Sequence, residues 1–426
     1  MIPESEYKKR RERLAKKLKP DSLSLLFSAS KKVRSNDTEY PFRQDSNFYY
    51  LCGFKEDSAA LLFVKDKNSK TKTYLFVAKK EPLEELWNGK RLGVKEAKKS
   101  FSVDEVFEYS ELNGKIKEFM SGVSRLYYDF KLDYSKVKLV KRYSKSIYTI
   151  ENIALLIERM RLIKSANEIK LIKKAIAITK EAHHRAMKMA ATLSYEYELQ
   201  AEIEYLFKKS GAQSDAYTSI VASGDNANTL HYISNDAKLL KDTLILIDAG
   251  CEYRYYASDI TRTIPSSKKF TKAQKEIYGM VLEVQKEIIS MIKPGIYRSD
   301  LQRRAEHLLC KGMVELGILK GSVSKLLKQE AHKKYYPHGI GHWMGLDVHD
   351  QAPYRDKNSK EIALKAGMVL TIEPGVYLPK DDKSIPKKYR GIGVRIEDDI
   401  LIKKDGYENL SKEIFKEIKD IESLIS

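Results

Sequence analysis

The sequence predicts a mixed α+β protein built from two parts that meet near residues 161–165. Its 426 residues exceed the usual length of one domain. Hydrophobic residues make up 42% and charged residues 32%, which is enough apolar surface for a sizeable core and argues against disorder. Short strand-like runs fill the first part, and long amphipathic helices with β-hairpins fill the second. We therefore expect an α/β domain over residues 1–164 and an α+β domain over residues 165–426.

The first part should alternate strands with helices. Apolar runs over 23–28, 59–64 and 73–77 are typical of short strands. Helical patterns follow over 83–89 and 104–120. This part has few histidines and shows no group of potential metal ligands, so we expect the chemistry to lie in the second part.

Two capping boxes mark long helices in the second part. Ser165 and Glu168 are spaced so that each side chain binds a backbone amide at a helix start, and Thr271 and Gln274 repeat this spacing. The second helix should end at the Pro294-Gly295 pair, which cannot continue it. Short apolar runs over the following ranges predict strands: 244–247, 253–258, 368–372 and 393–396.

Four of these strand regions carry a carboxylate at or near one end. These acids are Asp248, Asp259, Glu373 and Glu397. The residues between the first two should form a hairpin that brings both onto neighbouring strands. Four buried carboxylates together would repel one another strongly, and divalent cations would remove that repulsion. We therefore expect two metal ions about 3.5–4 Å apart that activate a water molecule and polarise a carbonyl group.

A histidine-rich segment, HGIGHWMGLDVHD, adds the nitrogen ligand that such a centre uses. His338, His342 and His349 lie within twelve positions in a chain with eight histidines. An oxygen-rich set with one imidazole suits Mn²⁺, Co²⁺, Zn²⁺ or Fe²⁺. Four other histidines lie outside this histidine-rich segment and away from the strand-end carboxylates, and we expect them at the surface: His183, His184, His307 and His332.

Composition limits the remaining classes of function. Cys52, Cys251 and Cys310 are far apart and odd in number, so we expect buried thiols rather than disulfides or a zinc knuckle. The net charge of +19 comes from lysines spread over the whole chain, which favours a solvated surface over a specific nucleic-acid site. No apolar run is long enough to span a bilayer, and the charged N-terminus lacks an apolar signal segment. We expect a cytoplasmic protein.

These segments resemble the pita-bread metallopeptidases, most closely the branch of Xaa-Pro aminopeptidases known as aminopeptidase P of the bacterial type. The resemblance rests on the following segments: IVASGDNANTLHY, LILIDAGCEYRYYASDITRT, HGIGHWMGLDVHD, LTIEPGVYLP and GIGVRIEDD, with RSNDTEYPFRQDSNFYYLCGF and LWNGKRLG in the first part. It covers nearly the whole chain. It implies a creatinase-like N-terminal domain followed by a pita-bread catalytic domain.

The resemblance also implies a role for each candidate metal ligand. Asp248 would bind one ion, Asp259 and Glu397 would bridge the pair, and His342 and Glu373 would complete the second site. The implied reaction removes the N-terminal residue from peptides with proline in the second position, through a hydroxide that bridges two metal ions. Glu373 would also take the proton from that water. The implied ions are most commonly Mn²⁺, with Co²⁺, Zn²⁺ or Fe²⁺ as alternatives.

Further residues match positions that contact substrate in the family. His231 would lie near the scissile nitrogen, and His349 near the carbonyl oxygen. His338 would line the proline pocket. Tyr217 and Arg395 would support the metal site and the substrate.

The resemblance implies an oligomer as well. Close relatives are homotetramers in which a tryptophan matching Trp87 reaches the active site of a neighbouring subunit. The alternative for Trp87 is a packed aromatic in its own domain. Relatives often have glycine where this chain has Tyr255 and Ser258. Two other functions share the fold: a prolidase, which takes only Xaa-Pro dipeptides, and a non-catalytic peptide-binding module.

Overall fold

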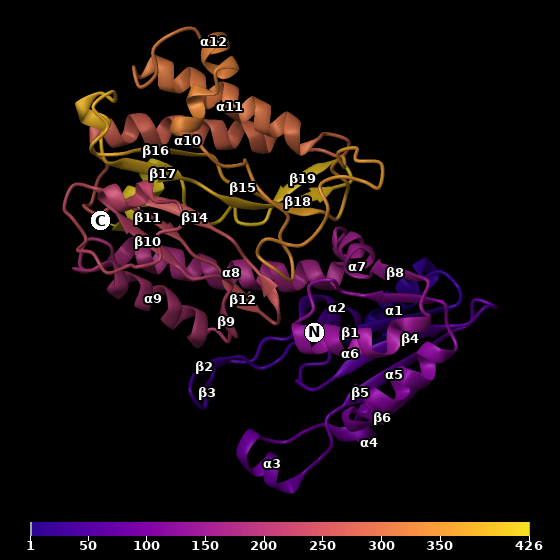
Figure 1. The fold of residues 1–426 in the computed structure, drawn as a ribbon. Helices are drawn as coiled ribbons and strands as arrows, with labels where there is room; N and C mark the ends of the chain where they lie inside the picture. The colour runs from indigo at the N-terminus through magenta and orange to yellow at the C-terminus, as the bar shows by residue number, and fades with distance from the viewer. Residues whose placement is uncertain (1, 426) are drawn as a thin grey trace. The chain divides into compact units, whose positions relative to one another are not determined.

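A computed structural model describes residues 2–425, which form two compact units that divide between Arg161 and Leu162. Helices and strands are mixed in both units (Figure 1), which confirms the predicted fold class. The second unit begins at Leu162, three residues before the capping-box serine Ser165.

A six-stranded sheet organises the first unit, in the order β6-β5-β4-β1-β7-β8. Its central strand β1 (Ser22–Phe27) is antiparallel to β4 (Ala60–Lys65) and parallel to β7 (Arg125–Tyr128). All six residues of β1 are buried, as in a sheet covered on both faces. The other elements of this unit are α1 (Glu4–Lys17), β2 (Val33–Ser35), β3 (Thr38–Glu39), α2 (Ser46–Cys52), β5 (Thr71–Val77), α3 (Pro82–Asn88), α4 (Gly93–Ser100), β6 (Glu105–Glu108), α5 (Leu112–Ser121), α6 (Tyr134–Tyr143), β8 (Thr149–Asn152) and α7 (Ala154–Arg161).

The strands predicted over 23–28, 59–64 and 73–77 correspond to β1, β4 and β5. The helix predicted over 104–120 is wrong in its first half, because Glu105–Glu108 forms β6 beside β5. Pairing with an existing sheet edge outweighs the weak helical pattern there.

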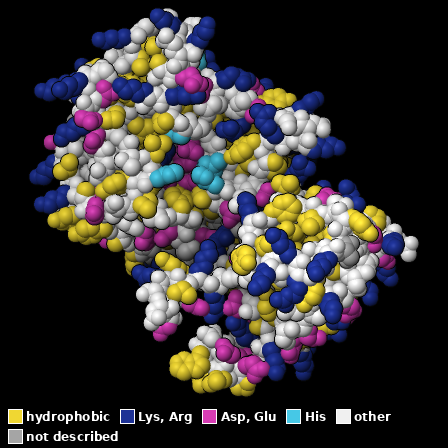
Figure 2. Space-filling model, viewed as in Figure 1, with side chains coloured by type: hydrophobic (Ala, Val, Ile, Leu, Met, Phe, Trp, Pro, Cys, Tyr) yellow, Lys and Arg dark blue, Asp and Glu magenta, His cyan; other side chains and the backbone are white. Residues whose placement is uncertain are grey.

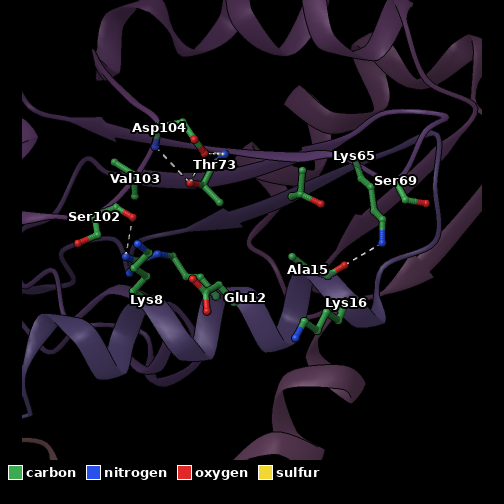
Figure 3. Close-up of a pocket in the computed structure, with 12 residues that line it drawn as sticks. Lys8, Glu12, Ala15, Lys16, Lys65, Ser69, Thr73, Ser102, Val103 and Asp104 are labelled. Carbon is green, nitrogen blue, oxygen red and sulfur yellow. Dashed lines mark hydrogen bonds between the residues drawn. The ribbon is translucent and has the colours of Figure 1, made fainter.

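A buried lysine joins α1 to this sheet. Lys65 at the end of β4 donates its Nζ to the carbonyl oxygens of Ala15 (3.0 Å) and Leu18 (2.7 Å), and so satisfies acceptors left open at the end of α1. Figure 3 shows this contact in a pocket of about 530 Å³, in which Thr73 and Asp104 also bind each other. The pocket contains no histidine and only scattered acidic groups, so it does not resemble a metal centre.

The second unit places several short sheets between two helix pairs. In Figure 1 the strands β10, β11 and β14 to β19 lie between α8–α9 and α10–α11, whereas β9 and β12 lie beside α9. The strand orders are β10-β11-β14, β13-β12-β9, β15-β18-β19 and β16-β17. Its elements are α8 (Ala166–Met189), α9 (Glu196–Lys209), β9 (Ser214–Asp215), β10 (Ile220–Ser223), β11 (Leu244–Asp248), β12 (Cys251–Tyr253), β13 (Tyr256–Ala257), β14 (Thr261–Pro265), α10 (Lys272–Ser290), α11 (Arg298–Glu315), α12 (Val323–Lys328), β15 (Val369–Ile372), β16 (Gly375–Leu378), β17 (Ile392–Arg395), β18 (Asp398–Lys403), β19 (Gly406–Asn409) and α13 (Ile418–Ile425).

Both capping boxes form as predicted. The Ser165 hydroxyl accepts the Glu168 N–H, and the Thr271 hydroxyl accepts the Gln274 N–H, with the reciprocal bonds also present. The predicted strand over 253–258 is instead a hairpin between β12 and β13. Arg254 and Tyr255 form its two-residue turn, both at positive φ (51° and 72°). Left-handed geometry of this kind favours glycine.

The three cysteines are buried free thiols, as predicted. Two of the four histidines expected at the surface are buried, however. His183 lies on the inner stripe of α8 with Thr179 and Ala186, and His332 is enclosed near α11. His307 is exposed and His184 is half-buried, so the surface prediction was wrong for His183 and His332.

Candidate metal centre

Strand pairing brings the four predicted carboxylates to one place. Asp248 is the last residue of β11 and lies opposite Thr261 of β14. Asp259 precedes β14 by two residues rather than lying within a strand. Glu373 and Glu397 lie between two antiparallel pairs, because Ile372 pairs with Asp398 on one side and Gly375 with Arg395 on the other. The Glu397 N–H donates to the Thr261 carbonyl at 3.0 Å, which joins the two halves.

The histidine segment lies directly against β15. The Thr371 N–H donates to the His342 carbonyl (2.9 Å), and the His342 N–H donates to the Thr371 hydroxyl (3.1 Å). Gly341 allows this approach, because a Cβ there would lie 1.9 Å from the Thr371 oxygen. The glycine of this motif is therefore required for the position of His342.

The five side chains form overlapping sets that could each hold a cation. Asp248, Asp259 and Glu397 each offer an oxygen, and these atoms lie within 4.8 Å of one another. His342, Glu373 and Glu397 form a second such set that shares Glu397. The His342 Nδ1 lies 3.0 Å from the Trp343 carbonyl and donates to it. Its Nε2 faces Asp259 Oδ2 at 3.2 Å and donates to it while the ring is protonated; loss of that proton would leave the Nε2 lone pair for a cation.

The ionisation of these groups reflects crowding of negative charge. Burial, opposed by His342 and assisted by Asp259, raises the pKa of Glu373 to about 7. Burial and then Asp259 raise the pKa of Glu397 well above its usual range. Burial lowers the pKa of His342, but its hydrogen bond to Asp259 raises it to about 9 overall. Bound cations would relieve this repulsion, so the donor set fits divalent metals.

A polar network surrounds the acids. The Tyr217 hydroxyl lies 2.6 Å from a carboxylate oxygen of both Asp248 and Asp259, and it can donate to one at a time. Arg395 donates its Nη2 to Asp248 (2.6 Å) and its Nη1 to the Tyr377 hydroxyl (2.9 Å). These contacts hold the Asp248 and Asp259 carboxylates in place.

His338 joins this network as a neutral ring. Its Nδ1 lies 2.8 Å from the Gly339 carbonyl and donates to it, so its Nε2 accepts the Tyr377 hydroxyl at 2.8 Å. Burial, and then Arg395, lower the pKa of His338 to about 4. An uncharged imidazole therefore faces the pocket at neutral pH.

The pocket in front of the acids has a volume of about 590 Å³. His231 and His349 lie exposed along it, and the His349 ring stands 3.9 Å from the His342 ring between centroids. Figure 2 shows histidines gathered around acidic side chains in a hollow of this face. The structure thus brings together every predicted site residue of the second unit. The apolar part of the lining is Ile220, Leu230, Ile233 and Val348.

Sequence reasoning missed three polar side chains of the site. The Thr261 hydroxyl donates to Glu397 Oε2 (2.7 Å), and the Thr371 hydroxyl donates to Glu373 Oε1 (3.3 Å). Tyr377 connects Arg395 with His338. All three lie in the segments that carry the family resemblance, but no spacing rule points to them individually.

Trp87 belongs to the first unit and lies on α3. Its side chain is 80% exposed, and no residue of α3 is buried. The alternative of a packed aromatic within its own domain is therefore wrong.

Comparisons with known proteins agree along the whole chain. Residues 170–404 match the model of metallopeptidase family M24, and residues 7–127 match the aminopeptidase P N-terminal domain. The chain is 41% identical to a Xaa-Pro aminopeptidase of Haemophilus influenzae and 39% identical to one of Escherichia coli, covering all of this chain and 98% of each relative.

Solved structures show the same fold. Proline aminopeptidase P II from Yersinia pestis superposes with a TM-score of 0.96 at 37% identity, covering 100% of this chain and 99% of that one. Aminopeptidase P from E. coli with the inhibitor Pro-Leu gives 0.95 at 38% identity, covering 100% and 98%. The described residues contain no helix long and apolar enough to cross a membrane. The chain belongs to metallopeptidase family M24, with an aminopeptidase P N-terminal domain ahead of its catalytic unit.

Proposed function

We propose that this chain is a metal-dependent Xaa-Pro aminopeptidase, which hydrolyses the bond between the N-terminal residue of a peptide and a proline in second position. One observation carries this proposal. Five side chains with metal-binding atoms converge at strand ends beside a pocket of about 590 Å³. Full-length relatives named for this activity support it.

The site would hold two divalent ions. Asp248, Asp259 and Glu397 would bind one, and His342, Glu373, Asp259 and Glu397 would bind the other. Four carboxylates and one imidazole suit Mn²⁺ best, and Co²⁺, Zn²⁺ and Fe²⁺ are alternatives. A solved relative, zinc-substituted E. coli aminopeptidase P in complex with product, supports zinc as one of these alternatives.

The bound ions would supply an acidified water molecule and polarise the substrate carbonyl. Glu373 would accept the proton from that water, because its carboxylate faces the pocket and the Thr371 hydroxyl orients it. His349 would donate a hydrogen bond to the carbonyl oxygen as negative charge develops there. His231, exposed along the same pocket, would lie near the nitrogen of the leaving proline.

Proline must be recognised by its shape, since its ring fixes φ and removes the amide hydrogen. His338 lines the pocket, and the Tyr377 hydroxyl, which also accepts from Arg395, holds its ring in place. His338 is uncharged at neutral pH, because its pKa is lowered to about 4, and an uncharged imidazole suits an apolar ring.

We also propose that the chain works as a homo-oligomer, a dimer or tetramer, in the cytoplasm. Leu83, Leu86 and Trp87 leave an apolar face of α3 exposed, which a neighbouring subunit would cover. Three buried free thiols suit a reducing compartment.

The experiment compares Ala-Pro-Ala with Ala-Ala-Ala, using metal-stripped protein before and after addition of Mn²⁺. We expect cleavage only after reconstitution, with kcat/KM at least about tenfold higher for the proline peptide, or about 1.4 kcal/mol of transition-state binding. Full activity in the stripped protein, or equal rates on both peptides, would refute the proposal.

A further inference from the structure

Helix α11 places a glutamine directly behind the histidine segment. Gln302 Oε1 accepts the backbone N–H of Ile340 at 2.6 Å. Its Nε2 donates to Glu306 Oε1, one turn further along the helix, at 2.9 Å. The Gln302 amide group is therefore held through both its oxygen and its nitrogen. It binds the middle residue of the HGIGH segment, Ile340, and neither Gln302 nor Ile340 lines the metal pocket.

Ile340 transmits this contact to the proposed proton acceptor. Its carbonyl accepts the Glu373 N–H at 2.9 Å, on the other side of the same residue. Two residues on, the His342 backbone is tied to Thr371 through both its N–H and its carbonyl. A displacement of Ile340 would thus move both protein ligands that are specific to the second proposed metal.

Arg298, one turn before Gln302 on α11, supports the neighbouring peptide. Its Nη1 lies 3.4 Å from the Gly341 carbonyl, a longer and weaker contact than that of Gln302. Its guanidinium also packs 4.8 Å from the Tyr354 ring centroid. The short bond from Gln302 is therefore the stronger restraint that α11 places on the segment.

We propose that Gln302 is a positioning residue of the metal centre, which sets the alignment of His342 and Glu373 by fixing the Ile340 peptide. This proposal deepens the proposed function and rests on it for the identity of the reaction. Gln302 does not line the pocket, and it acts on the metal ligands only through the Ile340 backbone. Groups of this outer kind commonly change metal affinity or activity by about 10–100-fold when they are replaced.

The test uses Gln302→Met, which keeps the length of the side chain but neither accepts from Ile340 nor donates to Glu306. Mn²⁺ binding is measured by calorimetry on the full-length protein, and kcat and KM on Ala-Pro-Ala at saturating Mn²⁺. We expect one of two Mn²⁺ sites to weaken by about tenfold and kcat to fall by about tenfold. KM should stay within about twofold, since the substrate pocket is not altered.

A charge-conserving exchange supplies the rescue. In Gln302→Glu/Glu306→Gln, one oxygen of the new carboxylate accepts the Ile340 N–H, and the other accepts a hydrogen bond from the new amide one turn further along. This double variant should restore Mn²⁺ affinity and kcat to within about threefold of wild type, and Glu306→Gln alone should match wild type. If Gln302→Met does not fold, Gln302→Asn is too short to reach Ile340 and is measured instead.

The outcomes separate the two proposals. Wild-type protein that binds two Mn²⁺ but leaves Ala-Pro-Ala intact overturns the proposed function, and the calorimetry still decides the role of Gln302. Two unchanged Mn²⁺ sites in Gln302→Met, or loss in that variant without rescue by the exchange, overturns the positioning role.

Discussion

Glu373 illustrates how one residue can serve two purposes at this site. Its carboxylate belongs to a candidate metal set, and burial raises its pKa to about 7 in the metal-free site. As a carboxylate it can also accept a proton from a metal-bound water. Thr371 and Ile340 hold its side chain and backbone respectively.

We predict that Glu373→Gln lowers kcat on Ala-Pro-Ala by about 10²–10⁴-fold, because an amide cannot take the proton. Steady-state kinetics with elemental analysis of bound metal measures this. Glu408→Gln is the matched control, since Glu408 forms only exposed ion pairs with Lys173 and Lys403. Equal activity of the two variants would remove Glu373 from the mechanism.

A second residue-scale prediction concerns His183. Its Nε2 lies 3.0 Å from the Ala249 carbonyl, and burial lowers its pKa to about 4. The unfolded chain, with a pKa near about 6.5, therefore takes up the proton first as the pH falls. His183 stabilises the fold fully above about pH 6.5, and this contribution of about 3 kcal/mol is lost progressively towards pH 4.

Urea unfolding of metal-free wild type and His183→Gln between pH 4.5 and 8 measures this effect. The difference in unfolding free energy between the two proteins should be constant above about pH 7 and change by about 1.4 kcal/mol for each pH unit between about 6.5 and 4.5. A difference in unfolding free energy that stays the same from pH 8 to 4.5 would contradict the lowered pKa of His183.

At the scale of elements, apolar runs and capping boxes correctly predicted strands and helix starts, because these depend on residues close together in the chain. The apolar runs ending in Asp248 and Glu373 form β11 and β15, and both capping boxes start helices. The hairpin expected between Asp248 and Asp259 forms, but the run over 253–258 was read as one strand, and the aromatic sequence did not show that its turn lies at Arg254 and Tyr255. His183 was wrongly expected at the surface because the absence of metal ligands nearby says nothing about burial. Its helical spacing from the buried residues Thr179 and Ala186 places it on the inner stripe of α8.

Helix α3 carries the element-scale prediction. Leu83, Leu86 and Trp87 are 67–80% exposed on a helix with no buried residue. We expect light scattering to show an oligomer at micromolar concentration, and Trp87→Ala to lower kcat/KM on long Xaa-Pro peptides by about tenfold, given the roughly 1–3 kcal/mol that one buried aromatic contributes.

Tyr148→Ala provides the control, because Tyr148 is a 90% exposed aromatic of the same unit outside α3. A monomer would refute the proposed assembly. Wild-type kinetics in Trp87→Ala would leave the oligomer standing but remove Trp87 from the substrate cleft.

At the scale of the whole molecule, family resemblance predicted the fold that spacing alone could not. No local rule places Tyr377 beside Arg395, or Gln302 behind Ile340, because each contact joins segments separated in the chain. Figure 2 shows Lys and Arg side chains spread over the visible face of each unit, in keeping with the predicted solvated surface.

Metal binding should stabilise the second unit in a pH-dependent way. In the metal-free site the pKa of His342 is about 9 and that of Glu373 about 7, so protons compete with Mn²⁺ increasingly as the pH falls below about 9. We predict a larger rise in Tm on adding Mn²⁺ at pH 8 than at pH 6, with about 2.7 kcal/mol expected where free Mn²⁺ is about 100 times Kd. Calorimetric melting measures it, and an equal rise at both pH values would contradict proton competition.

The length of the accepted peptide tests the central claim most directly. A prolidase must bind the free carboxylate directly after proline, whereas an aminopeptidase P must let the chain continue. The measurement is kcat/KM of Mn²⁺-loaded protein on Ala-Pro and on Ala-Pro-Ala, followed by release of free alanine. We predict efficient cleavage of the tripeptide and weaker cleavage of the dipeptide. Cleavage of Ala-Pro with Ala-Pro-Ala left intact would contradict the account and identify a prolidase.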